Sequence, residues 1–178
     1  MKIKNIIKIL IIVLVVIQLS NVELFAVEIE DFKDITAQNV ILVETDTGKI
    51  LYEKDAYEKI YPASTTKLMT AILVMENCSL DEIVTVSENA VRSVPFGYVN
   101  ANLQVGEEIM VEQLLYAMLL PSANDAANAL AEHVAGSIES FSAMMNTKAI
   151  EIGCKNTNFT NPSGLHQKEH YSTAYDLY

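Results

Sequence analysis

The decisive segment of this chain reads Tyr61-Pro62-Ala63-Ser64-Thr65-Thr66-Lys67-Leu68-Met69-Thr70. Ser64 and Lys67 have the spacing Ser-x-x-Lys at a predicted helix start, and residues three apart on a helix share a face. This spacing therefore places a hydroxyl beside an amine. A serine hydroxyl is a weak nucleophile until a base takes its proton, and a lysine can be that base only if burial or neighbours lower its pKa. The segment predicts a nucleophilic serine activated by a lysine.

Apolar residues further along predict a helix over 67–76. Four of them, at i, i+3, i+4 and i+7 spacing, form one stripe: Leu68, Ala71, Ile72 and Met75. We expect Ser64 and Lys67 to project next to this stripe, so that burial favours the neutral amine of Lys67. The pair would lie at the helix N-terminus, where backbone N–H groups and the helix dipole favour developing negative charge.

The rest of the chain predicts strands followed by helices. Two β-branched, apolar runs, 39–44 and 50–53, flank a turn that contains Gly48, and they predict a hairpin. Weaker signals predict a strand over 83–86, a short helix capped by Ser87, and helices over 111–120, 126–134 and after Ser137. The buried face of the helix over 111–120 would consist of Leu114, Leu115, Met118 and Leu119. Because βαβ alternation is absent, the pattern favours a mixed α/β chain of the α+β type, with an antiparallel sheet and packed helices.

The first residues predict an export signal. Lys2, Lys4 and Lys8 form a basic start, the apolar run 9–19 follows, and Ala26 closes the segment. An uncleaved N-terminal anchor is the alternative, although the run is short of the roughly 20 apolar residues that a membrane span needs. We expect a signal peptide over 1–26, an acidic tail over 27–38, and an exported protein of the cell envelope.

The charge balance limits the class of partner. The formal net charge is −11, and removal of the lysine-rich signal would make the remainder more acidic. Nucleic acid and anionic lipid are both attracted to basic surfaces, so we expect neither as a partner. Two cysteines, Cys78 and Cys154, could pair in an exported protein, but neither has a CxxC or metal-site spacing, which favours free buried thiols.

A second chemical element is Ser122-Ala123-Asn124, in a loop between two apolar helices. The Ser122 hydroxyl could relay a proton to a leaving amine, and the Asn124 amide could bind a substrate carbonyl or hold Lys67. The alternative is that Ser122 or Asn124 only caps the helix that follows. Ser87-Glu88-Asn89 has the same Ser-x-Asn pattern and is interpreted as such a cap.

A competing motif is His166-Gln167-Lys168-Glu169-His170, the inverted zinc-protease pattern H-x-x-E-H. That pattern requires a helix, because only then do both histidines face the same way. Here it lies in polar sequence without an apolar stripe, so we expect loop residues and no metal. His133, on the helix after Ser122, is expected to be a surface or packing residue.

The two elements together resemble the serine DD-peptidases and serine β-lactamases. The segments 46–54, 61–67, 161–165 and 170–177 make the chain more specifically similar to the low-molecular-weight penicillin-binding proteins, the D-alanyl-D-alanine carboxypeptidases. The resemblance implies that residues 39–178 form part of a DD-peptidase catalytic domain. Its fold would be β-lactamase/DD-peptidase-like and would include a helical subdomain. The resemblance also implies Ser64 as nucleophile, Lys67 as base, Ser122 as proton relay and Asn124 as a substrate-binding residue, with no cofactor.

One element of that family is absent from the sequence. The family carries Lys-Thr-Gly on a later strand, where a second oxyanion donor and the site for the substrate carboxylate lie. Here Thr47-Gly48-Lys49 has the same letters in another order and reads as the hairpin turn. We therefore expect an incomplete copy of the catalytic domain that lacks the C-terminal part of its sheet. Membrane association would be possible only through the missing C-terminal region.

The expected function is a penicillin-sensitive serine D-Ala-D-Ala carboxypeptidase that acts on peptidoglycan pentapeptides and is acylated by β-lactams. A serine β-lactamase is one alternative, although no Glu-x-x-x-Asn element for its deacylating water occurs over 136–178. An inactive, truncated wall-binding protein is the other.

Overall fold

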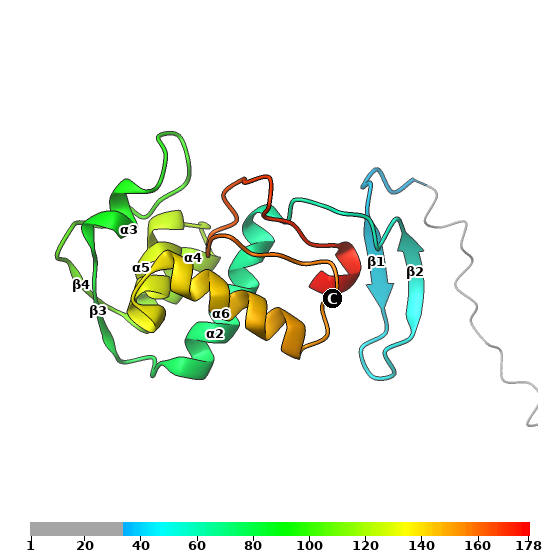
Figure 1. Ribbon diagram of the computed structural model, residues 1–178, viewed down its shortest axis with the longest axis horizontal. Coiled ribbons are helices and arrows are strands. Elements are labelled where there is room, and N and C mark those ends of the chain that lie inside the picture. The colour runs from blue at the N-terminus through cyan, green and yellow to red at the C-terminus, as the bar shows by residue number, and fades with distance from the viewer. Residues whose placement is uncertain (1–33) are drawn as a thin grey trace, which may run out of the picture. The chain divides into compact units, whose positions relative to one another are not determined.

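The computed structural model describes residues 34–178. The predicted signal peptide (1–26) and most of the predicted tail (27–38) lie outside the described residues, so those predictions remain untested. Residues 37–178 form the unit described below (Figure 1). Among the described residues, no helix combines the length and the apolarity that crossing a membrane requires.

The predicted hairpin is present. Strands β1 (Val40–Val43) and β2 (Ile50–Lys54) pair antiparallel, with Val40 opposite Lys54. Glu44 organises the turn, because its carboxylate accepts hydrogen bonds from the backbone N–H groups of Asp46 (2.8 Å) and Thr47 (2.9 Å). Gly48 has φ +69°, a left-handed conformation that favours glycine.

A group of helices forms the core. Helix α5 (Asn124–Ala135) packs against α2 (Thr66–Asn77), α4 (Val111–Leu119) and α6 (Ile138–Glu151) (Figure 1). The alanines of α5 allow this close packing because they are small, and four of them are almost fully buried: Ala126, Ala127, Ala129 and Ala131. Large core side chains fill the space around them: Leu114, Met118, Leu130, Phe141 and Met145. Leu119, predicted to be buried, is 45% exposed.

The predicted apolar stripe of α2 is wrong. Leu68, Ile72 and Met75 are exposed, and only Ala71 of the four is buried. The buried face instead carries Lys67, Met69, Thr70, Leu73 and Val74. Both faces contain apolar residues at helical spacing, so periodicity could not choose between them. Packing against α5 and α6 decides the orientation.

The smaller elements complete the described chain. Strands β3 (Ile83–Thr85) and β4 (Glu108–Met110) form a second antiparallel pair, and β4 was not predicted. The short helices are η2 (Ala63–Thr65), α3 (Glu88–Arg92) and α7 (Ala174–Leu177). Ser87 and Ser137 cap α3 and α6 as predicted, accepting hydrogen bonds from Ala90 N and Ser140 N. The helices with small antiparallel sheets agree with the predicted α+β class.

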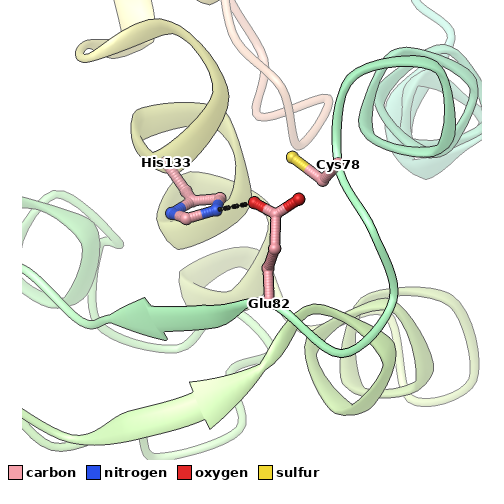
Figure 2. Close-up of side chains that lie close together, drawn as sticks. All are labelled: Cys78, Glu82 and His133. Carbon is pink, nitrogen blue, oxygen red and sulfur yellow. Dashed lines mark hydrogen bonds and ion pairs between the residues drawn. The ribbon is translucent and has the colours of Figure 1, made fainter.

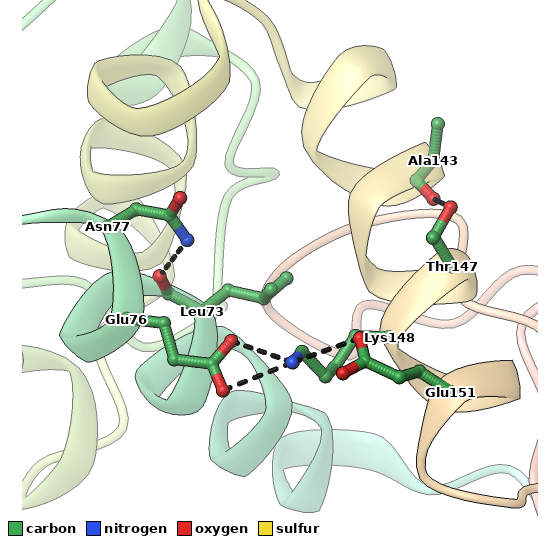
Figure 3. A network of polar contacts seen from close by, with 7 residues as sticks. All are labelled: Leu73, Glu76, Asn77, Ala143, Thr147, Lys148 and Glu151. Atoms are coloured by element: carbon green, nitrogen blue, oxygen red, sulfur yellow. Dashed lines mark hydrogen bonds and ion pairs between the residues drawn. The ribbon is translucent and has the colours of Figure 1, made fainter.

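An ionic cluster joins α2 to α6 (Figure 3). Lys148 Nζ lies 2.9 Å from a Glu76 carboxylate oxygen and 3.1 Å from one of Glu151. The hydrogen bonds to Glu76 and then to Glu151 raise the pKa of Lys148. The cluster connects the C-terminal part of α2 to the last turns of α6 at the surface.

Candidate active site

Ser64 and Lys67 lie together at the beginning of α2, as predicted. Ser64 belongs to η2, which leads directly into α2, and it is exposed. Lys67 Nζ donates to Ser64 Oγ across 3.4 Å. Pairs of nucleophile and base are often this loose before substrate binds. Ala63, just before the serine, has φ +47°, and such strain in a residue other than glycine is concentrated at functional sites.

Lys67 is buried, with 2% of its surface exposed. Its ammonium donates to Asn124 Oδ1 (2.8 Å) and to the backbone carbonyl oxygen of Ser163 (2.7 Å), and neither acceptor carries a full charge. Burial lowers the pKa of Lys67 from 10.5 to about 8. At pH 7 roughly a tenth of the molecules would therefore hold the neutral amine. The prediction of a desolvated lysine agrees with the structure, although a different face of α2 buries it.

Asn124 lies in the first turn of α5 and does not cap that helix. The N-cap residue is Ala123, with no side-chain cap, so the capping alternative for Ser122 and Asn124 is wrong. Asn124 Oδ1 instead accepts from Lys67, and Nδ2 donates to the Val99 carbonyl oxygen at 2.9 Å. The Asn124 amide thus holds Lys67, one of the two roles that the sequence left open. Its contact with substrate stays a prediction.

Ser122 faces the same groove as the pair. The groove has a volume of about 310 Å³ and is lined by Ser64, Thr65, Lys67, Leu68, Met118, Leu119 and Ser122. Among the described residues, Ser122 Oγ is the buried side-chain polar atom that has no hydrogen-bond partner. Its backbone has φ +68°, again strained for a residue with a Cβ. A buried hydroxyl without a partner is costly, which suits a group that acts on a ligand.

A larger hollow lies elsewhere. It has a volume of about 550 Å³, and Cys154, Asp176 and Tyr178 are among its lining residues. No serine–lysine pair lines it. The candidate site is therefore identified by its reactive side chains and not by the size of its groove.

Sequence reasoning did not find the third contact of Lys67, which the segment 161–165 supplies. Asn161 Oδ1 accepts from the backbone N–H groups of Ser163 (3.2 Å), Gly164 (2.8 Å) and Leu165 (3.1 Å) and so shapes a tight turn. This turn aims the Ser163 carbonyl at Lys67. The segment 161–165 contributed to the family resemblance, but nothing in its residues indicated that the Ser163 carbonyl contacts Lys67.

The two histidines of the H-x-x-E-H pattern do not converge. His166 is exposed and lies edge-on to Tyr61, whereas His170 is buried. Thr160 N donates to His170 Nδ1 (3.0 Å), so the other nitrogen, Nε2, carries the proton toward Thr66 Oγ1 (2.8 Å). Burial first, and the charge of His166 second, lowers the pKa of His170 to about 4. The segment is loop, as predicted, and His170 supports the start of α2.

The two cysteines are both free. Cys78 and Cys154 are each half-buried and form no disulfide. The prediction of free thiols is confirmed, although their burial is only partial.

Comparisons with known proteins agree with this geometry. The D-alanyl-D-alanine carboxypeptidase DacF of Bacillus subtilis is 43% identical over 146 residues, which cover 79% of this chain and 37% of that protein. The crystal structure of penicillin-binding protein 5 from Haemophilus influenzae has 35% identity and a TM-score of 0.75, over 80% of this chain and 43% of the other.

A single-residue variant of the Streptomyces K15 DD-transpeptidase has 36% identity and a TM-score of 0.75, over 79% of this chain and 58% of the other. The chain thus spans between 37% and 58% of these three relatives. Residues 26–178 match the profile of the D-alanyl-D-alanine carboxypeptidase family, and the chain belongs to that family.

Proposed function

We propose that this protein is an exported, penicillin-sensitive serine D-Ala-D-Ala carboxypeptidase that removes the terminal D-alanine from peptidoglycan stem peptides. The observation that carries the proposal is the buried Lys67 amine, 3.4 Å from Ser64 Oγ, with its pKa lowered to about 8. A base whose pKa lies close to the working pH is well suited to proton transfer. Family membership supports the same chemistry.

In the first half of the reaction Ser64 becomes acylated. The neutral Lys67 amine accepts the proton of the Ser64 hydroxyl while Oγ attacks the carbonyl carbon of the penultimate D-alanine. The tetrahedral intermediate then loses the terminal D-alanine as the C–N bond breaks, which leaves an ester on Ser64. Ser122 Oγ passes a proton from the Lys67 ammonium to the departing amine. The position of Ser122 in the same groove as Ser64 and Lys67 supports this role.

In the second half water attacks the ester. Lys67, neutral again after the relay, accepts the proton of this water, and the shortened peptide leaves with Ser64 restored. Asn124 and the Ser163 carbonyl keep the Lys67 amine in one position throughout, because both hydrogen bonds are short and buried. The backbone N–H of Ser64 is one donor for the developing oxyanion, and such a donor contributes roughly 10²–10³ in rate.

β-Lactams use the same first step. The Ser64 oxygen attacks the lactam carbonyl, the ring C–N bond opens, and the amine stays tethered to the acyl group. Slow hydrolysis of that ester would leave the protein labelled. A fluorescent penicillin is therefore a direct probe of the proposed nucleophile.

The test uses a full-length version of the protein and its Ser64→Ala variant. We expect a stable fluorescent adduct and D-alanine release from a model peptide ending in D-Ala-D-Ala, both lost in Ser64→Ala. Equal labelling of the variant would overturn the assignment of Ser64. Rapid turnover of penicillin without a lasting adduct would identify a β-lactamase instead. No adduct at all, with retention on purified peptidoglycan, would identify an inactive wall-binding protein.

A further inference from the structure

A second cluster of chemically capable side chains lies at the other end of α2 (Figure 2). Cys78 directly follows α2, Glu82 precedes β3, and His133 is in the last turn of α5. One ligand atom from each, the Cys78 Sγ, a Glu82 oxygen and a His133 ring nitrogen, lies within 4.8 Å of the other two. Cys78 lies eleven positions after Lys67, which corresponds to about 17 Å along a helix. The cluster is therefore outside the candidate active site.

Hydrogen bonds to neighbouring elements hold the side chains and backbone of this cluster in place. Glu82 Oε1 accepts from Ser79 N (2.6 Å), and Glu82 Oε2 lies 3.1 Å from His133 Nε2. The backbone of Glu82 is fixed as well, because its carbonyl oxygen accepts from Val111 N at 2.9 Å. Cys78 N donates to Val74 O, the last hydrogen bond of α2. Two helix ends and a strand start thus present one ligand each.

We propose that Cys78, Glu82 and His133 form a zinc-binding site, with water as the fourth ligand. A thiolate, an imidazole and a carboxylate are the ligand types that zinc takes in proteins, whereas calcium and magnesium prefer oxygen alone. Zinc bonds of about 2.0–2.3 Å place tetrahedral ligand atoms about 3.5 Å apart. The Glu82–His133 distance of 3.1 Å is already close to that value. The ligand atoms lie within 4.8 Å of one another, so the sulfur needs to approach by at most about 1.3 Å.

The cluster is open to solvent. The Glu82 and His133 side chains are 43% and 25% exposed, so an ion can enter from solvent. Burial first, and the Glu82 charge second, raises the pKa of Cys78, which keeps the metal-free thiol protonated. A bound zinc ion reverses this balance: the S–H proton leaves to solvent as the Zn–S bond forms. The bound ion would connect α2, β3 and α5 and so stabilise the folded chain.

The experiment measures metal binding by the reduced, chelator-treated 178-residue chain. Zinc is titrated in competition with a chromophoric chelator, and cobalt(II) is added to a second sample, where thiolate ligation gives a charge-transfer absorption band. The variants are Cys78→Ser, Glu82→Gln and His133→Gln. The matched controls are Cys154→Ser, which removes the other free thiol, and His166→Gln, which removes an exposed histidine.

We expect one zinc ion per chain and a cobalt–thiolate band in the parent and in both controls. Cys78→Ser should abolish the band, and His133→Gln or Glu82→Gln should weaken zinc binding by about tenfold or more, since loss of even an outer-shell partner costs that much. Circular dichroism checks that each variant folds, and zinc should raise the melting temperature of the parent and not of Cys78→Ser. No zinc binding by the parent would overturn the proposal. So would a cobalt band that survives Cys78→Ser or is lost in Cys154→Ser.

Discussion

Gly164 lies directly against the backbone of Ala63: a Cβ added to Gly164 would be 1.8 Å from the Ala63 carbonyl oxygen. Gly164 belongs to the turn that aims the Ser163 carbonyl at Lys67, and Ala63 precedes Ser64. The missing side chain of Gly164 thus permits the contact between the two segments that form the candidate site.

Gly164→Ala should therefore destabilise the protein. Gly106→Ala is the matched control, because Gly106 has nearly the same φ (+83° against +82°) and a Cβ added there would meet no atom within 4 Å. Both variants carry the left-handed strain, but only Gly164→Ala adds a clash, which should lower the free energy of unfolding by about 2 kcal/mol more. Urea denaturation of both variants measures this difference. Equal stabilities would show that the two segments separate freely.

Lys67→Arg should abolish the proposed base while keeping a positive charge. A guanidinium stays protonated, so it cannot accept the Ser64 proton. The second-order rate of acylation by penicillin should fall by about 10²–10⁴-fold. The matched control is Lys148→Arg, since Lys148 lies on α6 away from Ser64, and this variant should be acylated at the same rate as the parent. A parental rate in Lys67→Arg would mean that another group removes the proton.

Ser122→Ala separates chemistry from stability. Ser122 Oγ has no hydrogen-bond partner among the described residues, so its removal breaks no hydrogen bond and should raise the free energy of unfolding by about 1–3 kcal/mol. D-Alanine release should nevertheless decrease by about 10²–10⁴-fold, because the leaving amine loses its proton donor. Peptide turnover and thermal melting, measured on the same preparation, distinguish the two effects. A stable variant with unchanged turnover would remove Ser122 from the mechanism.

His170 should make the fold sensitive to acid. Its pKa is about 4 in the folded protein against 6.5 ordinarily, so between these values the unfolded chain binds a proton that the folded chain does not. The free energy of unfolding should decrease as the pH falls through this window, by about 3 kcal/mol from this group. Urea denaturation from pH 7 to about pH 4 should show a shallower loss in His170→Gln than in the parent. Parallel curves would assign the acid sensitivity to other groups.

The sequence was most informative where the signal is local. The hairpin around Gly48, the pair Ser64–Lys67 and the Ser87 cap each depend on residues close together in the chain, and each is present. The prediction of which face of α2 is buried was wrong, because Leu68, Ile72 and Met75 have the same periodicity as the residues that do pack. Only the tertiary contacts with α5 and α6 distinguish the two faces.

The contacts of Lys67 show a second limit. The Ser163 carbonyl is a backbone group, which every residue carries, so no letter in the sequence marks it as a partner. Asn124 was named as a site residue, but its choice between capping α5 and holding Lys67 depends on where α2 lies. Motifs identified the reacting groups, and three-dimensional packing determined what positions them.

A buried Lys67 that activates Ser64 is the central claim, and the pH dependence of acylation tests it most directly. The second-order rate of penicillin acylation, followed from about pH 6 to about pH 10 and corrected for spontaneous hydrolysis, reports the base of the free protein. We predict a rate that rises with pH and levels off above an apparent pKa of about 8. A rate that does not change with pH, or that rises only toward the ordinary lysine value of 10.5, would contradict the claim.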